Sequence, residues 1–404
     1  MSKGLVNMPR ACIALRGVLD WRTRKTAQAL IAGGFDVTIV QFADPSIICD
    51  CRGLNVINVA PPFMGGSKVK WRPLRVALNL GPLRLAAALS QKKQGLFFNE
   101  IIYKSIINER PDIIHGINVD VLEACTMAAK KLGAYLIYEA YEYWPDHLTE
   151  EALYYSQEQR NHAARIEEIC IGSVDRVITV SPVLAKAYQE HYKLTSCPEI
   201  VYNAPLTISQ SAAQPSTPLR LLFLGNLQRE RNVMTVLKAA LRVPGVALTF
   251  QGSGDMKAEL LSVIESNDAA DRVFIREPVP LDEVTRSAQE HDVGIVAHQA
   301  YNVQMEGALP NKFFEYLSGG LAVIVPSTET FREFPGIDTF GLLVEEPDEI
   351  RLSETFEVLK DKKDEIFEMK TSALKAASKY TGTSQLEKIQ RIYRDLLRSI
   401  PKAS

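Results

Sequence analysis

The sequence predicts an α/β protein with two Rossmann-like parallel-sheet domains that face each other across a cleft. Short runs rich in Val and Ile alternate with segments whose apolar residues recur at helical spacing. Strands that alternate with helices form parallel sheets covered by helices on both faces. The same alternation starts again in the second half of the chain. The length of 404 residues exceeds what one hydrophobic core usually serves, which favours two domains.

The first half predicts one sheet, strand by strand. The run ACIAL opens the series, and TRKTAQALIAGG predicts a helix that ends at Gly33 and Gly34. Further strands and helices follow in the segments DVTIVQF, PDIIHGI, VLEACTMAAKKLG, AYLIYEA, DRVITVS and PVLAKAYQEHY. Residues 1–207 are therefore assigned to a first Rossmann-like domain.

The second half repeats this pattern after a stretch that is rich in Ser, Ala and Pro. Residues 208–218 have the composition of a linker. The segments LRLLFLGN, NVMTVLKAALRV, VALTFQGSGD, DRVFIREPV, DVGIVAH, NKFFEYLSGG and AVIVP then predict a second domain over residues 219–382. Residues 383–404 contain an amphipathic helical pattern, and this helix is expected to pack back toward the first domain.

Composition predicts a globular cytoplasmic protein. The formal net charge is −2, with 46% hydrophobic and 23% charged residues, which gives no indication of nucleic-acid binding. No apolar run approaches the roughly 18 residues that span a bilayer. Six cysteines are scattered without the paired spacing of zinc sites, so they are expected to be buried thiols and no structural metal is expected.

The stretch ALPNKFFEYLSGGLAVIV places Lys312 and Glu315 on the first turns of a predicted helix. Pro310 suits a helix start, where unpaired N–H groups and the helix dipole attract anions. Lys312 adds a positive charge at this end, and Glu315 lies one turn further along the same face. The pair predicts binding of a phosphate and a diol, as in a nucleotide. A simple salt bridge between the two side chains on a solvated face is the alternative.

The second half resembles the nucleotide-binding domain of retaining, two-domain glycosyltransferases of family four, which have the GT-B fold. FLGNLQRERN, FQGSGD, VPLDEV, DVGIVAH and LPNKFFEYLSGGLAVIV occur in the family's order. The resemblance implies that Arg231 and Lys312 hold a diphosphate, that Glu315 holds a ribose, and that backbone groups near Glu277–Val279 face the base. The donor-binding residues that it implies are Gly225, Asn226, Arg231, Gly254, Val279, Leu309, Lys312 and Glu315.

Two positions of the second half depart from the family's pattern, and Ile117, Asn118 and Tyr141 depart from it in the first half. Many members carry a second glutamate eight residues before the ribose glutamate, and Gly307 occupies that position here. Glu306 lies one residue away; it either reaches the donor sugar as a catalytic candidate or is solvated. Asn226 stands where many relatives have an arginine that helps to hold phosphate. His298 also follows a predicted strand of this domain and is a weaker candidate.

The first half resembles the same family more loosely. VLDWRTRKTAQALIAGGFDVTIV resembles a branch with an Asp-x-Arg element, which Asp20 and Arg22 match, in a loop that starts at Gly17. The segment from DIIHGI to YEYWPD is similar to a part of the family that carries acceptor-side residues. The catalytic candidates that follow from it are His115, Asp120 and Glu142. His115 is alternatively a hydrogen-bonded core histidine, while Tyr141, Tyr143 and Trp144 suit stacking against a sugar.

The resemblance implies a retaining hexosyltransferase that uses a nucleotide-diphosphate sugar, with UDP-sugar as the expected donor, and a hydroxyl acceptor that is lipid-linked or a polysaccharide precursor. No Asp-x-Asp triplet is present, so no essential metal and no cofactor are expected. A nicotinamide dehydrogenase is disfavoured because QGSGDMKAE gives only two glycines of the dinucleotide fingerprint. A sugar-nucleotide epimerase and a catalytically silent sugar-nucleotide-binding scaffold stay open.

A basic segment lies in the first half. Residues 52–93 contain eight Lys and Arg side chains and no Asp or Glu, with Trp71 and several leucines between the basic residues. Such a surface suits anionic lipid. The segment predicts peripheral docking on the inner face of the membrane; a solvated helix pair is the alternative.

Overall fold

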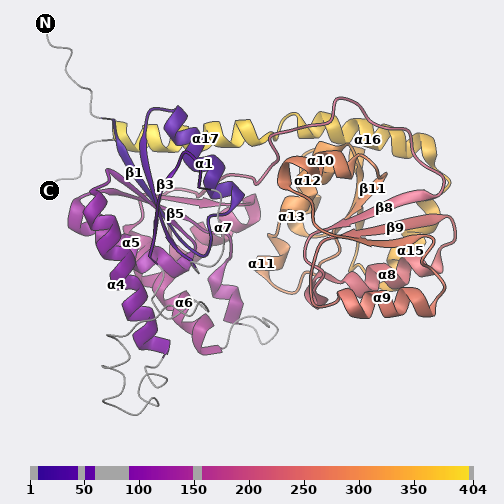
Figure 1. Cartoon of the computed structure of the whole chain (residues 1–404), viewed down its shortest axis with the longest axis horizontal. Coiled ribbons are helices and arrows are strands. Elements are labelled where there is room, and N and C mark those ends of the chain that lie inside the picture. Colours follow the sequence, from indigo (N-terminus) through magenta and orange to yellow (C-terminus); the bar gives the residue numbers. More distant parts are fainter. Residues whose placement is uncertain (1–7, 44–50, 60–90, 149–156, 400–404) are drawn as a thin grey trace, which may run out of the picture. The chain divides into compact units, whose positions relative to one another are not determined.

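The computed structural model describes residues 8–43, 51–59, 91–148 and 157–399 (Figure 1). Contacts divide the chain into two units. The first comprises Met1–Thr179, Tyr188–Glu199 and Leu386–Ser404, and the second comprises Val180–Ala187 and Ile200–Gln385. Most of the basic segment predicted to dock on lipid lies outside the described residues.

The first unit is built on a seven-stranded sheet of order β3-β2-β1-β4-β5-β6-β7. The pairs from β3 to β6 are parallel, with Arg10 opposite Asp36 and Ala11 opposite Ile113. Its strands are β1 (Arg10–Arg16), β2 (Asp36–Phe42), β3 (Asn55–Asn58), β4 (Ile113–Ile117), β5 (Tyr135–Glu139), β6 (Arg176–Thr179) and β7 (Glu199–Ile200). Helices on its two faces are α1 (Trp21–Ala32), α4 (Gln91–Glu109), α5 (Val119–Leu132) and α6 (Gln157–Cys170). Helix α7 (Pro182–Tyr192) is divided between the units, with its residues up to Ala187 in the second.

The second unit contains a six-stranded parallel sheet of order β10-β9-β8-β11-β12-β13. Its strands are β8 (Leu219–Leu224), β9 (Val246–Gln251), β10 (Val273–Arg276), β11 (Val293–Ile295), β12 (Ala322–Pro326) and β13 (Gly341–Val344). Its helices are α8 (Val233–Arg242), α9 (Lys257–Ser266), α10 (Leu281–Ala288), α11 (Val303–Glu306), α12 (Asn311–Gly319), α13 (Glu329–Arg332), α14 (Ile337–Phe340), α15 (Glu349–Leu359) and α16 (Lys363–Ala377). Separate buried apolar clusters cover the two faces of the sheet.

Helix α12 packs directly on β11 because of one glycine. A Cβ atom added at Gly294 would lie 2.2 Å from the ring of Tyr316, so a larger residue on β11 would push α12 away. The Tyr316 hydroxyl donates to the carbonyl of Ile295 at 3.0 Å and accepts from the backbone N–H of Leu224 at 2.8 Å. This side chain therefore ties the ends of β8 and β11 to the start of the helix that carries Lys312.

Residues 208–218, which have the composition of a linker, belong to the second unit. Ser209 N–H donates to the carbonyl of Ser318 at 2.8 Å, and Ser216 N–H donates to Asp292 Oδ2 at 3.1 Å. Tyr202, which lies before this stretch in the sequence, packs against Phe314 with ring centroids 5.1 Å apart. A stretch that reads as a linker in composition is thus fixed by backbone hydrogen bonds.

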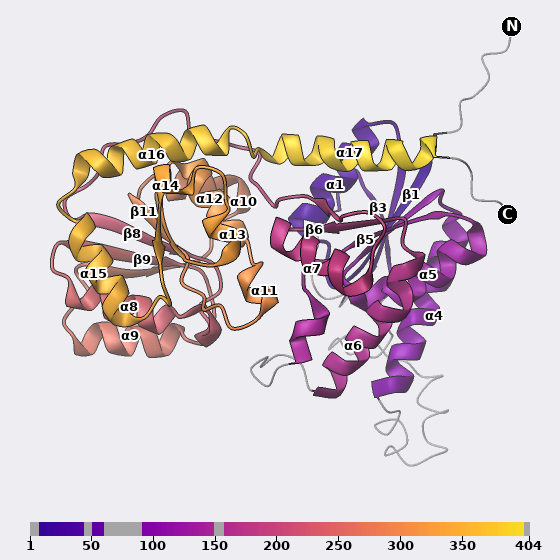
Figure 2. The same cartoon turned by 180° about the vertical axis from the view of Figure 1, so that it is seen from behind.

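The C-terminal helix α17 (Gly382–Arg398) lies along the first unit, as Figures 1 and 2 show. Gln390 Nε2 donates to the carbonyl of Ala29 at 2.6 Å. The ring of Tyr393 is buried against Phe35, with centroids 5.5 Å apart. The helix predicted to pack back toward the first domain is therefore part of that unit's core.

Both sheets have the strand order of Rossmann folds, in which ligands bind beyond the carboxyl ends of the strands where the order reverses. The reversal lies between β1 and β4 in the first unit and between β8 and β11 in the second. The loops that follow these four strands therefore define where a site is expected. None of the helices in the described part of the chain is long and apolar enough to span a bilayer.

Candidate functional site

Glycines allow the loop after β8 to pack closely against the loop after β9. Gly225 has a φ of +105°, which favours glycine, and its N–H donates to the carbonyl of Gln251 at 3.0 Å. A Cβ at Gly252 would lie 1.8 Å from the Gly225 carbonyl oxygen, and one at Gly254 would lie 2.2 Å from that of Leu227. The loops after β8 and β9 thus pack backbone to backbone, which explains the glycines of FLGN and QGSG. Asn226 is exposed at the tip of the first loop.

Lys312 lies beside this loop, in the first turn of α12. Its Nζ sits 3.8 Å from the centroid of the Phe223 ring, and a Cβ at Gly225 would be 3.6 Å from its Cε. Within the described ranges, no carboxylate lies within ion-pair distance of Lys312 Nζ. The alternative prediction, a salt bridge between Lys312 and Glu315, is therefore not formed in this structure. The ammonium group lies over the Phe223 ring instead.

Burial and the neighbouring charge of Arg231 lower the pKa of Lys312 to about 7, although Glu315 opposes the shift. Arg231 ends the 3-10 helix Arg229–Arg231 and is exposed. Two cations thus lie close together while, among the described residues, neither forms an ion pair with an acid. The repulsion between two such cations is relieved when an anion binds between them.

The start of α12 adds backbone donors to the two cations. Pro310 is the N-cap, and the first intrahelical bond at this end is from Phe313 N–H to the Pro310 carbonyl at 3.0 Å. The N–H groups of Asn311 and Lys312 therefore have no acceptor inside the helix. A helix start with free N–H groups and an adjacent lysine is a phosphate-binding arrangement.

The remaining predicted donor-binding residues surround this helix start. Glu315 is half-buried one turn after Lys312, Leu309 is buried just before the helix, and Val279 packs against the apolar cluster that holds Phe313. Asn232, which the sequence did not single out, donates from Nδ2 to the carbonyl of Ala297 at 2.8 Å. This bond joins the segment after β8 to the end of β11.

Glu306 has a contact that the sequence did not indicate. Its Oε2 accepts a hydrogen bond from the N–H of Glu329 at 2.7 Å, at the start of α13. The carboxylate thus caps a short helix. This bond engages one carboxylate oxygen, and contact between Glu306 and a donor sugar stays a prediction.

Several predicted residues lie at the carboxyl edge of the first sheet. Gly17 follows β1 with a φ of +105°, and Asp20 caps α1 by accepting from the Thr23 N–H at 2.7 Å. Asp120, in the first turn of α5, forms an ion pair with Arg16 at 2.7 Å. The switch point of this sheet is therefore polar, and Arg16 is a residue that sequence reasoning did not select.

Arg22 and His115 belong to a buried network centred on Glu139. Arg22 pairs with Glu139 Oε1, and His115 Nε2 lies 3.1 Å from Glu139 Oε2. His115 Nδ1 lies 2.9 Å from the hydroxyl of Tyr393 on α17. Burial would raise the pKa of Glu139, but Arg22 and His115 outweigh it and hold the pKa at about 2. His115 is fully buried, which favours its interpretation as a core histidine.

Glu142 follows β5 at the same edge and is half-buried. Its carbonyl oxygen lies 2.7 Å from the Tyr188 hydroxyl, which also lies 2.8 Å from Glu167 Oε1. The hydroxyls of Tyr138 and Tyr192 donate to Glu167 as well. Burial raises the pKa of Glu167 to about 7 against these hydrogen bonds. The segment that bears Glu142 is thus anchored through its backbone to a buried carboxyl group.

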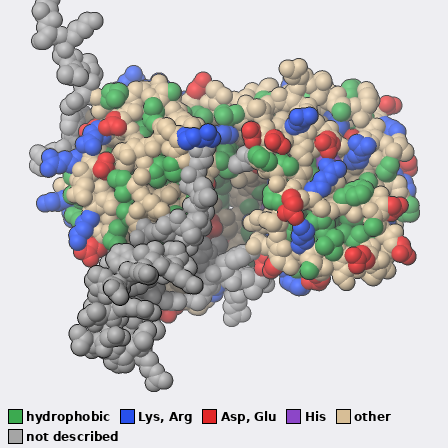
Figure 3. Space-filling view, in the orientation of Figure 1, with side chains coloured by type: hydrophobic (Ala, Val, Ile, Leu, Met, Phe, Trp, Pro, Cys, Tyr) green, Lys and Arg blue, Asp and Glu red, His purple; other side chains and the backbone are tan. Residues whose placement is uncertain are grey.

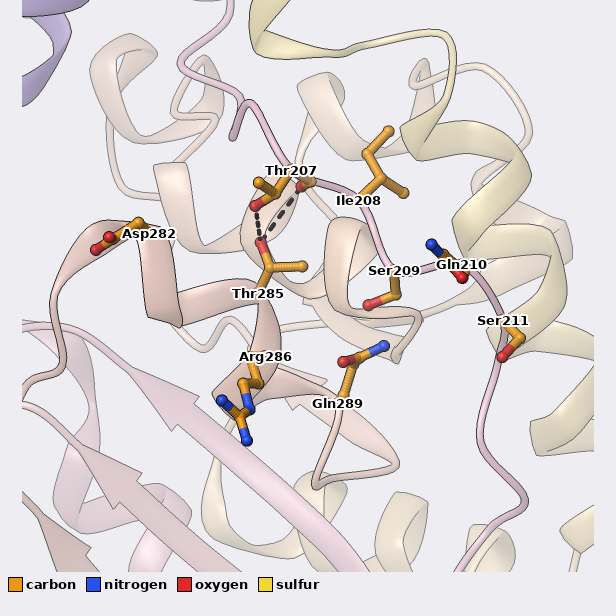
Figure 4. Close-up of a pocket in the computed structure, with 9 residues that line it drawn as sticks. All are labelled: Thr207, Ile208, Ser209, Gln210, Ser211, Asp282, Thr285, Arg286 and Gln289. Atoms are coloured by element: carbon orange, nitrogen blue, oxygen red, sulfur yellow. Dashed lines mark hydrogen bonds between the residues drawn. The ribbon is translucent and has the colours of Figure 1, made fainter.

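A separate open groove of about 440 Å³ lies between residues 207–211 and α10 (Figure 4). The sticks show hydroxyl and amide side chains together with Ile208, Asp282 and Arg286, and Thr285 is hydrogen-bonded to Thr207. None of the predicted donor-binding residues lines it. In Figure 3 basic and acidic side chains are interspersed on the visible face of the second unit, so that face has no charge of a single sign.

The two Rossmann-type sheets and the cationic helix start define a class, the GT-B glycosyltransferases. Sucrose-phosphate synthase from Thermosynechococcus elongatus has a similar structure, with a TM-score of 0.73, 14% identity, and coverage of 97% of this chain and 100% of that one. Anabaena HepE in complex with UDP-glucose gives a TM-score of 0.70 at 13% identity, covering 96% and 99%. The lipopolysaccharide outer core galactosyltransferase WaaB gives 0.59 at 14% identity, covering 96% and 99%.

Family models identify the chain more closely. The model described as Glycosyltransferase Family 4 matches residues 21–204, and the model described as Glycosyl transferases group 1 matches residues 206–379. The chain therefore belongs to the glycosyltransferases of this two-domain type, as the sequence motifs predicted. No curated protein matches it significantly.

Proposed function

We propose that this protein transfers a hexose from a nucleotide-diphosphate sugar, with UDP-sugar as the donor, to a hydroxyl acceptor with retention of configuration. The observation that carries the proposal is the uncompensated charge at the start of α12, where Lys312 and Arg231 lie beside free backbone N–H groups. A diphosphate supplies the two negative charges that this place lacks. Anabaena HepE, a structure of similar fold, was solved with UDP, and with UDP and glucose, which supports a UDP-linked donor.

The mechanism follows from where negative charge develops. As the bond between the sugar and the diphosphate breaks, the departing phosphate gains charge and the sugar approaches an oxocarbenium ion. Lys312, Arg231 and the N–H groups at the start of α12 stabilise this charge without reorganising, which is the main way such sites lower a barrier. Glu315 holds the ribose hydroxyls. We expect these groups to serve without an essential metal ion, so EDTA should leave the activity unchanged.

A screen of UDP-, GDP- and dTDP-sugars by thermal shift tests the donor proposal. RT ln(1 + [L]/Kd) predicts stabilisation of about 2.7 kcal/mol at a ligand concentration 100 times Kd, which is a clear rise in Tm. The same donor is then incubated with membrane extract, and NMR of the product gives the anomeric configuration. No shift with any donor would contradict the proposal. Conversion of donor alone would indicate an epimerase, and binding without donor consumption would indicate a silent scaffold.

The acceptor is proposed to be lipid-linked or a polysaccharide precursor, which places the protein in the cytoplasm and on the inner face of the membrane. The basic composition of residues 52–93 supports this part of the proposal. Flotation with vesicles that contain anionic lipid should carry the protein to the top of a gradient, and added salt should reverse the effect. Equal flotation with neutral vesicles would remove the membrane part of the proposal and leave the donor part intact.

A further inference from the structure

His298 follows β11 directly and lies at the switch point of the second sheet. Its side chain is only 4% exposed, and Nε2 forms no hydrogen bond within the described part of the chain. A hydrogen bond with the backbone of Met305 favours the protonated ring, and because Nε2 has no partner we assign this bond to Nδ1. The ring N–H is therefore the donor and the Met305 carbonyl the acceptor. A neutral imidazole in this tautomer presents Nε2 as a hydrogen-bond acceptor.

The surroundings keep this ring neutral. Burial lowers the pKa of His298 to about 4, and the charges of Arg231 and Lys312 contribute in the same direction. The positive charges of both cations of the proposed diphosphate site therefore favour the neutral ring. An acceptor nitrogen that is buried and unsatisfied is costly, and such atoms in native proteins usually have a partner.

The loop that follows His298 is fixed by its own contacts. Asn302 Oδ1 accepts from Met305 N–H at 2.9 Å, and Glu306 caps α13 through Glu329 N–H. These bonds fix the backbone of Met305 and one carboxylate oxygen of Glu306. In the described part of this segment, Nε2 of His298 is a buried nitrogen that has no hydrogen-bond partner.

We propose that His298 Nε2 accepts a hydrogen bond from a hydroxyl of the transferred sugar and is a donor-sugar-binding residue. The inference rests on the proposed function, because it needs a sugar diphosphate at the start of α12. Phosphate oxygens are themselves acceptors at neutral pH, so they do not pair with a neutral Nε2. The sugar is bonded directly to the diphosphate, and its hydroxyls are the donors nearest to that group.

The test separates the two ring nitrogens. His298→Asn keeps an N–H donor near the position of Nδ1, which can still reach the Met305 carbonyl, but removes the atom at the position of Nε2. His298→Gln places an acceptor near Nε2 instead. Calorimetry with UDP and with UDP-glucose, or with the pair selected by the donor screen, measures both affinities. We expect His298→Asn to weaken UDP-glucose binding about tenfold with UDP unchanged, and His298→Gln to restore most of the loss.

His291 provides the matched control. It is 3% exposed at the opposite end of β11, with Nδ1 3.2 Å from the Ser287 carbonyl, so His291→Asn should perturb the fold comparably and leave both affinities unchanged. Equal losses for UDP and UDP-glucose in His298→Asn, or no loss for either, would overturn the sugar contact while leaving the donor proposal standing. Absence of nucleotide binding by the wild-type protein would overturn the proposed function and this inference together. A fall in Tm for His298→Asn beyond that of His291→Asn, with unchanged affinities, would show a structural role only.

Discussion

Lys312→Met should weaken binding of UDP-glucose about 100-fold, a loss of about 2.7 kcal/mol. Methionine keeps the length of the side chain and its contact with the Phe223 ring, so the change removes the charge and little else. The ammonium group is half-buried and, among the described residues, unpaired with a carboxylate, so its removal should not lower the free energy of unfolding. Calorimetry gives the affinity, and thermal unfolding checks the fold.

The control is Lys238→Met, because Lys238 is an exposed lysine on α8 of the same unit and should leave the affinity unchanged. The pH dependence offers a second check. Lys312 has a pKa of about 7 in the empty site, and its charged form binds the diphosphate. Affinity should therefore be high below pH 7 and fall up to tenfold for each pH unit above it. Lys312→Arg stays charged and should remove this dependence. Equal affinity of the wild-type protein at pH 6.5 and 8.5 would contradict the assignment.

Glu139→Ala should destabilise the first unit by about 3–5 kcal/mol, because it leaves the buried guanidinium of Arg22 without its partner. The three tryptophans, Trp21, Trp71 and Trp144, all belong to this unit, so their fluorescence reports its unfolding in urea separately from that of the second unit. The double variant Arg22→Met/Glu139→Leu removes both charges and should recover most of the lost stability. If the single variant unfolds at the wild-type urea concentration, the network contributes nothing.

The same pair makes stability depend on pH in a predictable direction. Glu139 has a pKa of about 2 in the folded protein, below its ordinary value of 4.5. A depressed carboxyl pKa stabilises the fold fully above the unfolded pKa, and this contribution is lost as the pH falls from 4.5 toward 2. Wild-type protein should lose more stability over this window than the double variant does.

Much of the fold followed from local patterns in the sequence. DVTIVQF and PVLAKAYQEHY form β2 and α7 with the expected residues, because alternating β-branched runs and helical periodicity are properties of short windows. The helix start marked by Pro310 was also predicted, and the structure places Gly225 beside Lys312 there; their donor-binding role, with that of Glu315, stays a prediction. The structure then showed that Lys312 contacts Phe223, a residue 89 positions away, and this contact could not be read from spacing.

The features of the site that the sequence did not indicate depend on residues that are far apart along the chain. Tyr393 lies 278 residues from His115, and no local pattern pairs them. Glu306 binds an N–H group of a helix that begins 23 residues later, and His298 is distinguished by an atom that lacks a partner. Residues 208–218 have the composition of a linker, yet backbone hydrogen bonds, which any sequence can form, hold them on the second unit.

The position of α17 has a consequence for biosynthesis. The side chain behind His115 is supplied by Tyr393, so the interior of the first unit is incomplete until nearly the whole chain has left the ribosome. The second unit consists of residues 200–385 and the short segment 180–187. Its interior can therefore be completed earlier. The unit that is translated first therefore completes its interior last, and in the meantime it exposes apolar surface that favours aggregation.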